Sequence, residues 1–272
     1  MKADFKEYWD TIPDDPQEML TQFWHDRIDK IIKQYNGIIP DDFLCNKDIQ
    51  FTMFVRYEKY TPIELHYLAL KYKFFKLVEL LKEDGVGGLQ PMNIEGIQTT
   101  GNAIHMLYHL TKYASETGTY LTTIKSVIEW GGGFGNLCKI FCRLNRDCTY
   151  ILIDTKLFAY LQWVYLLEHF GHSDINFGSI EKGKINIIPL GLLTENHIEA
   201  EMFISTWAIS ESSVEAQSYV IDNSMFGASR FLIAHQGSSS DFPVADNVKR
   251  FVSGDVYSKE IEHLPGNYYL FK

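Results

Sequence analysis

The sequence predicts an α/β protein in which a doubly wound, mostly parallel sheet follows a helical N-terminal region. The first observation is the stretch SVIEWGGGFGN at 126–136, where a short apolar run with β-branched residues precedes a glycine loop. Apolar residues then recur at helical spacing as far as Leu144, so the stretch predicts a strand, a loop and a helix. The second is the run YILID at 150–154, which predicts the next strand and ends in a carboxylate. The third is the helical spacing of apolar residues through most of the N-terminal third.

The helical N-terminal region is predicted to occupy residues 1–95, and the sheet-containing core residues 96–272. Apolar residues at helical spacing predict one amphipathic helix over 15–35 and a second, longer helix over 61–84. The polar segment 91–100 is predicted to connect this region to the core.

Aromatic residues are dense on the predicted N-terminal helices. They are Tyr57, Tyr60, Tyr67, Tyr72, Phe74 and Phe75. Such a stripe is usually core or a homodimer contact, and a wall for stacking sugars is the alternative. A further helix is predicted over 102–115, with His105 and His109 one turn apart. A metal site would need a third ligand that is not obvious, so surface or packing histidines are favoured.

More elements are predicted along the remaining chain. These are a helix over 156–170 and strands over 202–205, 231–235, 248–252 and 268–271, with the last two strands antiparallel. Two short runs, 175–177 and 185–190, are both candidates for the third core strand, and the choice between them stays open.

The glycine loop predicts a site for a ligand that backbone amides can approach closely. A phosphate-binding P-loop requires Lys and then Ser or Thr after the last glycine, where this chain has Asn136 and Leu137. The dinucleotide fingerprint requires a third glycine at the position of Asn136, so that match is partial. An acidic-x-Gly-x-Gly-x-Gly pattern is matched in full. It consists of Glu129, Gly131, Gly133 and Gly135.

This pattern resembles the first motif of class I S-adenosylmethionine-dependent methyltransferases. The resemblance implies a Rossmann-like methyltransferase sheet with a helical N-terminal cap, and S-adenosylmethionine as the cofactor. It also implies that the loop wraps the methionine part and the ribose, with Glu129 near the methionine ammonium. Asp154 stands 19 residues after Gly135, about the spacing at which an acidic residue meets ribose hydroxyls in nucleotide-binding βαβ units. We therefore expect Asp154 on the ribose.

At residues 201–212 the sequence looks similar to bacterial putative sugar O-methyltransferases, which are often encoded with surface-polysaccharide genes. This resemblance covers about residues 100–272, and its specific part is the glycine motif. The resemblance implies a sugar or surface-polysaccharide (capsule) precursor as the methyl acceptor. The carboxyl end of the strand in this stretch faces the site at the switch point of a doubly wound sheet. Thr206 is therefore expected against the cofactor, and Trp207 and Ser210 against the acceptor. In methyltransferases the helix before the first strand often borders the pocket, which adds His109 as a candidate acceptor contact.

Methylation of a hydroxyl is helped by a base, and two residues are candidates. His235 ends a predicted strand, and its pKa lies near working pH. Glu211 follows the fourth strand, although it suits equally well a charge at the start of the next helix. A phosphate-type acceptor is already ionised, so it needs no base. It would instead be stabilised by cationic side chains, for which Arg230 and Lys249 are candidates.

Composition restricts the classes of function. The 272 residues carry a formal net charge of −10, which argues against a nucleic-acid substrate because phosphates call for a basic surface. The first residues lack the apolar segment of a signal peptide, and no apolar run is long enough to span a bilayer, so we expect a soluble, cytoplasmic protein. The Cys and His spacings fit no ligand set, so no metal is expected. Two alternatives stay open, an NAD-dependent oxidoreductase and a non-catalytic interaction protein that keeps the fold.

Overall fold

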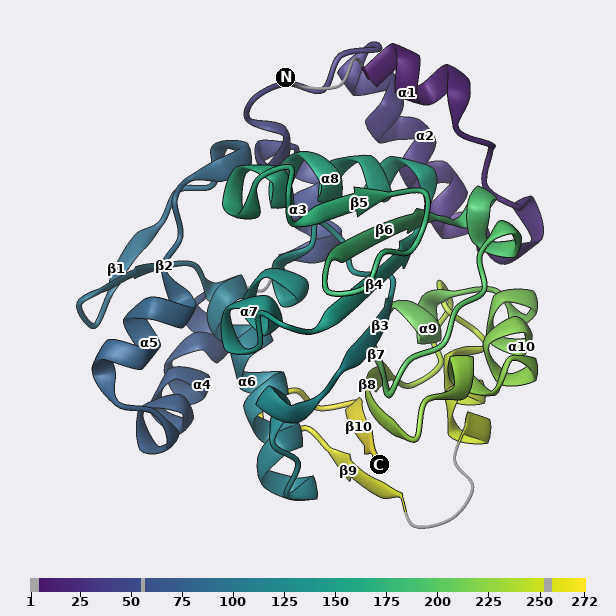
Figure 1. Cartoon of the computed structure of the whole chain (residues 1–272). Coiled ribbons are helices and arrows are strands. Elements are labelled where there is room, and N and C mark those ends of the chain that lie inside the picture. The colour runs from purple at the N-terminus through teal and green to yellow at the C-terminus, as the bar shows by residue number, and fades with distance from the viewer. Residues whose placement is uncertain (1–4, 55–56, 252–255) are drawn as a thin grey trace.

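The computed structural model describes residues 5–54, 57–251 and 256–272 (Figure 1). Within them, the main sheet has eight strands in the order β5-β6-β4-β3-β7-β8-β10-β9. These strands are β3 (Ser126–Trp130), β4 (Thr149–Asp154), β5 (Ile175–Phe177), β6 (Ile185–Pro189), β7 (Met202–Thr206), β8 (Arg230–Gln236), β9 (Tyr257–Glu260) and β10 (Asn267–Phe271). Every pair of neighbouring strands among β3 to β8 is parallel. Strand β10 is antiparallel to both of its neighbours, β8 and β9.

The remaining elements are helices and one small hairpin. The α-helices are α1 (Phe5–Thr11), α2 (Gln22–Tyr35), α3 (Lys47–Met53), α4 (Tyr57–Lys71), α5 (Phe74–Leu81), α6 (Gly101–Thr117), α7 (Asn136–Leu144), α8 (Lys156–Phe170), α9 (Ala208–Glu211) and α10 (Val214–Asp222). The hairpin consists of β1 (Met92–Ile94) and β2 (Ile97–Thr99). Short 3-10 segments are η1 (Gln17–Met19), η2 (Phe43–Cys45), η3 (Val86–Gly88), η4 (Leu121–Thr123), η5 (Leu190–Glu195), η6 (Ser224–Gly227) and η7 (Ala245–Phe251).

The order of the main sheet reverses at β3. Strands β4, β6 and β5 extend one side, and β7, β8, β10 and β9 extend the other. In such a sheet, ligands bind in the crevice beyond the carboxyl ends of the two central strands. The segments that follow Trp130 at the end of β3 and Thr206 at the end of β7 meet at this crevice. The predicted fold class, a doubly wound α/β sheet of the Rossmann-like methyltransferase type, is confirmed.

The pairing also identifies the third core strand. Strand β6 pairs directly with β4, with Asp154 opposite Pro189, whereas β5 pairs with β6 at the edge of the sheet. The run at 185–190 is therefore the third strand, and the run at 175–177 extends the sheet beyond it.

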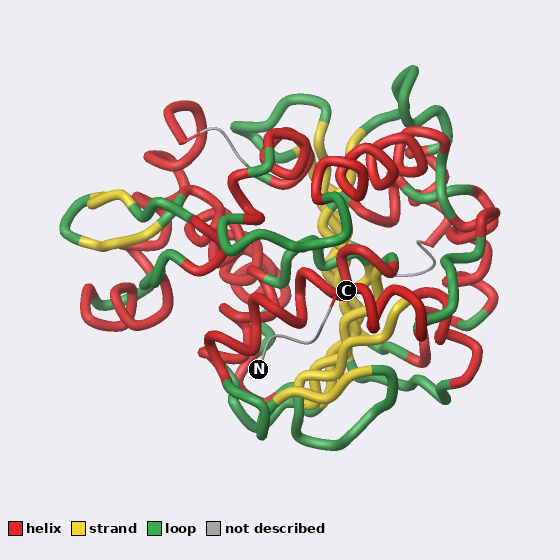
Figure 2. The backbone as a smooth tube through the Cα atoms, turned by 90° about the horizontal axis from the view of Figure 1, so that it is seen from above, coloured by secondary structure: helices red, strands yellow, loops and turns green. Residues whose placement is uncertain are grey.

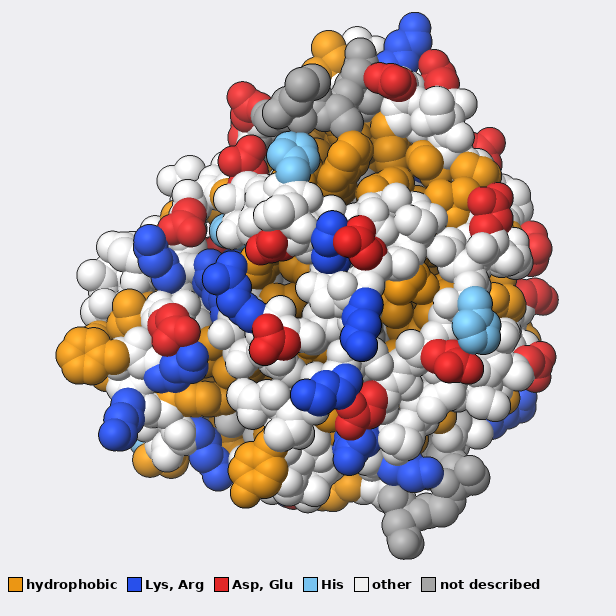
Figure 3. All heavy atoms as spheres, in the orientation of Figure 1, with side chains coloured by type: hydrophobic (Ala, Val, Ile, Leu, Met, Phe, Trp, Pro, Cys, Tyr) orange, Lys and Arg blue, Asp and Glu red, His pale blue; other side chains and the backbone are white. Residues whose placement is uncertain are grey.

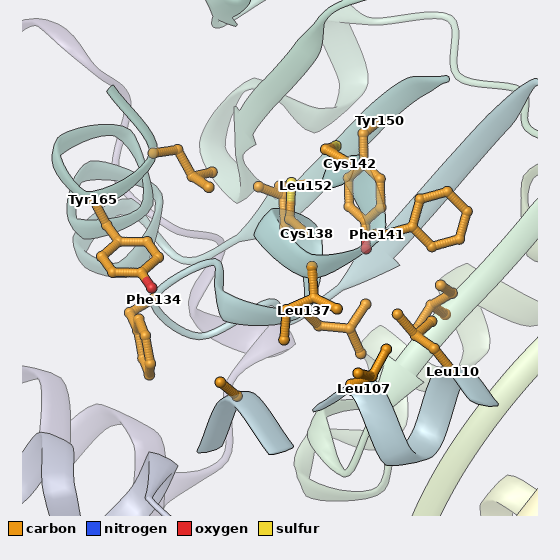
Figure 4. Packing of buried hydrophobic residues seen from close by; sticks show 14 of the residues in the cluster. Leu107, Leu110, Phe134, Leu137, Cys138, Phe141, Cys142, Tyr150, Leu152 and Tyr165 are labelled. Carbon is orange, nitrogen blue, oxygen red and sulfur yellow. The ribbon is translucent and has the colours of Figure 1, made fainter. Parts of the chain in front are cut away.

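Alternate residues of the central strands pack into two separate cores, one on each face of the sheet. Val127 and Leu152 belong to the core that includes residues of α6, α7 and α8. Ile128 and Ile153 belong to the core that includes residues of α9 and α10. Figure 2 shows the sheet as a twisted column with helices on both sides. Figure 4 shows the first core, where side chains of α6 and α7 meet Leu152 and its neighbours on β4.

Helices α1 to α5, which we call the N-terminal cap, pack against the first of these two faces. The Tyr8 hydroxyl of α1 donates a hydrogen bond of 2.7 Å to the carbonyl of Lys156, and the Tyr8 ring packs on Tyr160 of α8. Helices α4 and α5 pack on α6 and α7. The apolar residues of the N-terminal cap belong to the same core as those of α6 to α8. The predicted helical cap is therefore present.

The cap differs from the prediction where its helices begin and break. The helix predicted over 61–84 is wrong as a single helix, because Lys73 is extended (φ −68°, ψ 147°) between α4 and α5. The helix predicted over 15–35 starts with a 3-10 turn, and α2 begins only after the extended Thr21. Apolar spacing continues across both breaks, so periodicity could not reveal them.

The segment 91–100 is more regular than the predicted connector. It contains the antiparallel hairpin of β1 and β2, joined by Glu95 and Gly96 with φ of 49° and 85°. Two left-handed residues are what a tight hairpin turn requires. The sequence carries only short apolar alternation here, with Ile94 and Ile97 buried, and this was too little to predict a strand.

The strand predicted over 248–252 is wrong over 248–251, which form part of the 3-10 segment η7. Residue 252 lies outside the described residues. The strand that pairs with β10 is β9, a few residues later. It is mostly exposed, so its composition gave no apolar signal.

The surface carries mixed charge. On the face shown in Figure 3, Lys and Arg side chains alternate with Asp and Glu among the residues drawn in colour. Leu70 of α4 and Phe74 and Phe75 of α5 are exposed apolar side chains. The homodimer contact expected from the aromatic stripe stays a prediction. In the part of the chain that the structure describes, no helix combines the length and apolarity needed to cross a bilayer.

A buried ion pair joins the segment after α5 to the core. Lys139 of α7 donates hydrogen bonds to Glu83 (2.5 Å) and to the hydroxyl of Tyr165 (2.6 Å). The side chains of Lys139 and Glu83 are both fully buried. Burial lowers the pKa of Lys139 to about 8, and Glu83 opposes that shift. Removal of one partner would leave an uncompensated buried charge.

Glu83→Gln should lower the free energy of unfolding by about 3–5 kcal/mol, because Lys139 then stays buried without a counter-charge. Urea denaturation measures this loss. The double variant Glu83→Gln/Lys139→Met should recover part of it, since the unpaired charge is gone. A loss in Glu83→Gln of less than about 1 kcal/mol, the value of an exposed pair, would contradict this role.

Candidate active site

The glycine loop, residues 131–135, leaves the end of β3 and leads into α7. Gly131, Gly133 and Gly135 have φ of 72°, 59° and 93°, in the left-handed region that favours glycine. A Cβ atom at Gly131 would lie 2.1 Å from the Cβ atom of Ala208 in α9. At this position the loop needs glycine both for its conformation and for the space that it occupies.

Gly132, which the alternating pattern leaves out, is required as well. A Cβ atom there would lie 2.4 Å from Cδ2 of Leu152 and 3.3 Å from Oε2 of Glu129. The Glu129 side chain therefore lies directly beneath the loop. The sequence pattern did not single out Gly132 because this constraint comes from the neighbouring strand β4.

Glu129 is a buried carboxylate at the wall of the site. Its residue is 1% exposed, and its Oε2 accepts a hydrogen bond of 2.7 Å from the Tyr150 hydroxyl. Burial raises the pKa of Glu129 to about 7, and the bond from Tyr150 opposes the shift. A cationic group placed against this carboxyl would favour its ionised form.

Asn136 is the first residue of α7 and is 4% exposed. Neither its Oδ1 nor its Nδ2 has a hydrogen-bond partner within the described structure. The preceding residue, Gly135, is left-handed and offers no side chain to cap the helix. From the sequence, Asn136 was notable only as a mismatch to the P-loop and to the dinucleotide fingerprint.

Asp154 ends β4 and fastens the glycine loop. Its Oδ2 accepts hydrogen bonds from the backbone N–H of Gly133 (3.0 Å) and from Gln162 Nε2 (2.8 Å). Its Oδ1 accepts from the backbone N–H of Thr155 (2.8 Å). Burial raises the pKa of Asp154 to about 8, against the effect of these backbone bonds. The contact with a ribose stays a prediction.

Two adjoining cavities lie at the crevice of the sheet. The larger has a volume of about 330 Å³ and is bounded by the glycine loop, the segment after β7, α6 and the N-terminal cap. Its lining consists of Trp24, Thr52, Met53, Phe54, Asn102, His105, Met106, Glu129, Gly131, Gly132, Gly133, Phe134, Asn136, Leu137, Thr206, Trp207, Ala208, Glu211, Leu264 and Asn267.

The smaller cavity has a volume of about 80 Å³ and a mostly apolar lining. Asp154 and Thr155 supply polar groups there, and the Thr155 hydroxyl is buried without a partner in the described structure. Trp24 and Met53 line both cavities.

Trp207 lines the larger cavity directly after β7. Its φ of 65° is unusual for a bulky residue and marks local strain. Two hydrogen bonds of 2.6 Å stabilise this conformation. The backbone N–H of Trp207 donates to the carbonyl of Ala234, and its indole N–H donates to Oδ1 of Asn267. The ring stacks on His105 with a centroid separation of 5.5 Å. Trp207 thus presents a rigid aromatic surface to the larger cavity.

Glu211 lines the larger cavity at the end of α9. Its Oε1 lies 3.5 Å from Nε2 of Gln236. Burial raises the pKa of Glu211 to about 7, and a hydrogen bond from Trp24 of the N-terminal cap opposes the shift. A carboxyl group with this pKa can exchange a proton near neutral pH.

Four predicted site residues line neither of these cavities: Ser210, His235, His109 and Gly135. The Ser210 hydroxyl is fully buried and donates to the carbonyl of Trp207 (2.6 Å). His235 is 1% exposed, stacks on Tyr268 and has its Nδ1 3.1 Å from the carbonyl oxygen of Gln236. Burial lowers the pKa of His235. The roles expected for Ser210 and His235 stay predictions.

His109 is fully buried and belongs to a chain of hydrogen-bonded side chains. Its Nε2 lies 2.9 Å from Nε2 of His105, and its Nδ1 bonds with the hydroxyl of Tyr269. His105 Nδ1 and His263 Nε2 both bond with Oε1 of Glu64, at 2.6 and 2.8 Å. Burial alone would raise the pKa of Glu64, but the histidines lower it to about 2. His105, rather than His109, lines the larger cavity.

The structure thus brings most of the predicted residues together and adds others. Glu129, Gly131, Gly133 and Asp154 lie around one crevice with Thr206, Trp207 and Glu211. Sequence reasoning missed the residues that helices α2 and α3 and the segments beside them contribute. They are Met19, Leu20, Trp24, Thr52, Met53 and Phe54. The larger ones are apolar, and periodicity alone could not separate a cavity wall from core.

Within the described ranges, no group of three or more His, Cys, Asp or Glu side chains is arranged to hold a metal ion. His105 and His109, one turn apart, bond with each other and with Glu64 and Tyr269.

No protein-family model and no curated protein matches the chain. Among solved structures, the mitomycin 7-O-methyltransferase MmcR matches with 12% identity and a TM-score of 0.41, over 82% of this chain and 69% of that one. The pyocyanin biosynthetic protein PhzM matches with 12% identity and a TM-score of 0.41, over 89% and 74%. PigF with SAH matches with 10% identity and a TM-score of 0.39, over 79% and 70%. These likenesses are distant.

Gly131→Ala should lower the free energy of unfolding more than Gly118→Ala does. Both glycines are left-handed, with φ of 72° and 69°, and this conformation costs an alanine about 1–2 kcal/mol. Only at Gly131 does the new Cβ collide with Ala208, whereas a Cβ at Gly118 has no atom within 4 Å. The extra loss should be roughly 1–3 kcal/mol in urea denaturation. Equal losses would contradict the close packing of the glycine loop on α9.

Proposed function

We propose that the chain is an S-adenosylmethionine-dependent O-methyltransferase that acts on a hydroxyl of an uncharged sugar or surface-polysaccharide precursor. The observation that carries the proposal is the glycine loop with buried Glu129 beneath it and Asp154 at the end of the adjacent strand. Gly131 and Gly133 of this loop face both cavities. The loop can therefore contact one ligand that extends through both.

The two cavities suit the two parts of this cofactor. The smaller one combines an apolar lining, suited to an adenine ring, with Asp154 and the unpartnered Thr155 hydroxyl, which suit ribose hydroxyls. The larger one places Glu129 and Asn136 at the glycine loop, where the charged end of a methionine would lie. The sulfonium and the acceptor would then lie toward Thr206 and Trp207.

A dinucleotide cofactor suits this lining less well. Its diphosphate requires N–H donors and cationic side chains, and carboxylates repel it. The described residues that line the two cavities include Glu129, Asp154 and Glu211 but no Lys or Arg. This distribution of charge favours S-adenosylmethionine, a cation at its sulfur, over NAD.

The same lining favours an uncharged acceptor over a phosphorylated one. Thr52, Asn102 and Asn267 bring polar side chains to the lining, although each already bonds within the protein, Thr52 to the carbonyl of Asp48, Asn102 to that of Met53 and Asn267 with Trp207. Trp207 offers a ring face. These groups suit the hydroxyls and the C–H faces of a sugar. Neither of the two cations considered for a phosphate lines the cavities. Arg230 is the first residue of β8, so it lies at the amino ends of the strands, away from the site at their carboxyl ends. Lys249 pairs with Asp246.

Glu211 is the proposed base. When bound, S-adenosylmethionine supplies a methyl group that is already electrophilic. The protein therefore has to align the acceptor oxygen and take its proton. Glu211 lines the larger cavity and has a pKa raised to about 7, whereas His235 lies outside both cavities. A neutral hydroxyl acceptor can thus be deprotonated by Glu211 near neutral pH.

Calorimetry should detect binding of S-adenosylhomocysteine but not of NAD at the same concentrations, because the glycine loop faces carboxylates and no described cation. Asp154→Ala should weaken this binding by about 1.5–3 kcal/mol if its carboxylate accepts the ribose hydroxyls. A product-mass screen with S-adenosylmethionine and neutral or phosphorylated sugars then identifies the acceptor class. Binding of NAD alone would contradict the proposed function.

Glu211→Gln should reduce turnover by roughly 10²–10⁴-fold and leave S-adenosylhomocysteine affinity nearly unchanged, because only the proton acceptor is lost. A base works in its ionised form, so the parental rate should fall as pH falls through about 7. His235→Ala is the matched control and should keep both the parental rate and that limb of the pH–rate profile. Parental turnover in Glu211→Gln would exclude Glu211 as the base.

A further inference from the structure

We propose that Asn136 and Glu129 form a clamp for a zwitterionic α-amino-acid group, and that Asn136 is the residue that makes the site selective for a ligand with this group. The inference rests on the proposed function, since the methionine end of S-adenosylmethionine is such a group. It adds a role for Asn136 that neither the glycine pattern nor the fold assigns.

The first observation is the state of the Asn136 side chain. It is 4% exposed and lines the larger cavity, yet neither its amide oxygen nor its amide nitrogen has a partner in the described structure. A buried amide without partners is unfavourable, and native structures rarely keep one without a reason. The unpaired groups therefore indicate a ligand that offers both a donor and an acceptor.

The second observation concerns other groups that line the same cavity or lie beside Asn136 in the chain. Glu129, also in the cavity wall, has Oε2 bonded to Tyr150, and no bond to its Oε1 is found in the described structure. The helix that Asn136 opens, α7, has nine residues and no side-chain cap at its N-terminus. Its first N–H groups have no acceptor within the helix and favour an anion.

These groups complement an amino-acid zwitterion in both of its charges. An ammonium can donate to Oδ1 of Asn136 and to the carboxylate of Glu129. A carboxylate can accept from Nδ2 of Asn136 and from the N-terminus of α7. A diphosphate offers acceptors alone, so it would leave Oδ1 unpaired and would face the charge of Glu129. The position that is a glycine in the dinucleotide fingerprint thus carries a side chain with a different specificity.

The test compares two ligands that differ in the amino-acid group. S-Adenosylhomocysteine carries it, and 5′-methylthioadenosine has the same adenosyl part without it. In Asn136→Ala, calorimetry should show S-adenosylhomocysteine binding weakened roughly 10- to 100-fold, while 5′-methylthioadenosine changes by less than about 3-fold. Asn136→Asp should also weaken S-adenosylhomocysteine binding without weakening 5′-methylthioadenosine binding, because it keeps the shape of the side chain but replaces the amide donor with a second carboxylate.

Stability of the ligand-free protein gives an independent readout. Because the amide is unpaired, Asn136→Ala should unfold at the parental temperature or above it. Asn145→Ala is the matched control, since Asn145 is a buried amide at the other end of α7 whose Nδ2 bonds to the carbonyls of Leu121 and Ile124. That variant should unfold at a lower temperature and keep the parental ratio of the two affinities.

The outcomes separate this inference from the function on which it rests. If neither adenosyl ligand binds the parental protein, the proposed function fails. If both bind and the Asn136 variants weaken both equally or weaken neither, the function stands and the clamp is wrong. A marked loss of ligand-free stability in Asn136→Ala would make Asn136 a structural residue and would also overturn the clamp.

Discussion

The close approach of the glycine loop to the elements around it is the constraint on which the rest of the site depends. Gly131 lies against Ala208 of α9, and Gly132 lies against Leu152 of β4, so a side chain at either position would move the loop away from the sheet. Because no side chain intervenes, the backbone of the loop forms part of the wall of both cavities. Asp154 holds the loop from the far side through the N–H of Gly133.

The electrostatics of the site follow from burial of carboxyl groups beside this loop. Glu129, Asp154 and Glu211 all have pKa values raised by burial, which means that each is held at an energetic cost in its ionised form. A cationic ligand would offset that cost, whereas a diphosphate would increase it. The N-terminal cap takes part, because Trp24 and Met53 line both cavities.

Sequence reasoning succeeded where the signal is local. Glycines at 131, 133 and 135 mark positions of left-handed backbone, and the apolar runs on either side have the periods of a strand and a helix. Asp154 was expected near the loop because the spacing of a βαβ unit is nearly constant, and it accepts a hydrogen bond from the N–H of Gly133, whereas its contact with a ribose stays a prediction. Thr206 and Glu211 were placed beside the loop because the carboxyl ends of parallel strands share one edge of the sheet. In each case the inference needed only chain order and the geometry of regular elements.

Tertiary structure decided everything that depends on where side chains point and on which distant segments meet. The sequence by itself determined a doubly wound sheet with a glycine loop at its switch point. It could not choose between Glu211 and His235, because both follow neighbouring strands and only packing turns one toward the cavity and the other toward Tyr268. Nor could it identify Trp24 and Met53, which reach the site from other helices through long-range packing. Periodicity reports that a residue is buried, but what it is buried against is a property of the whole fold.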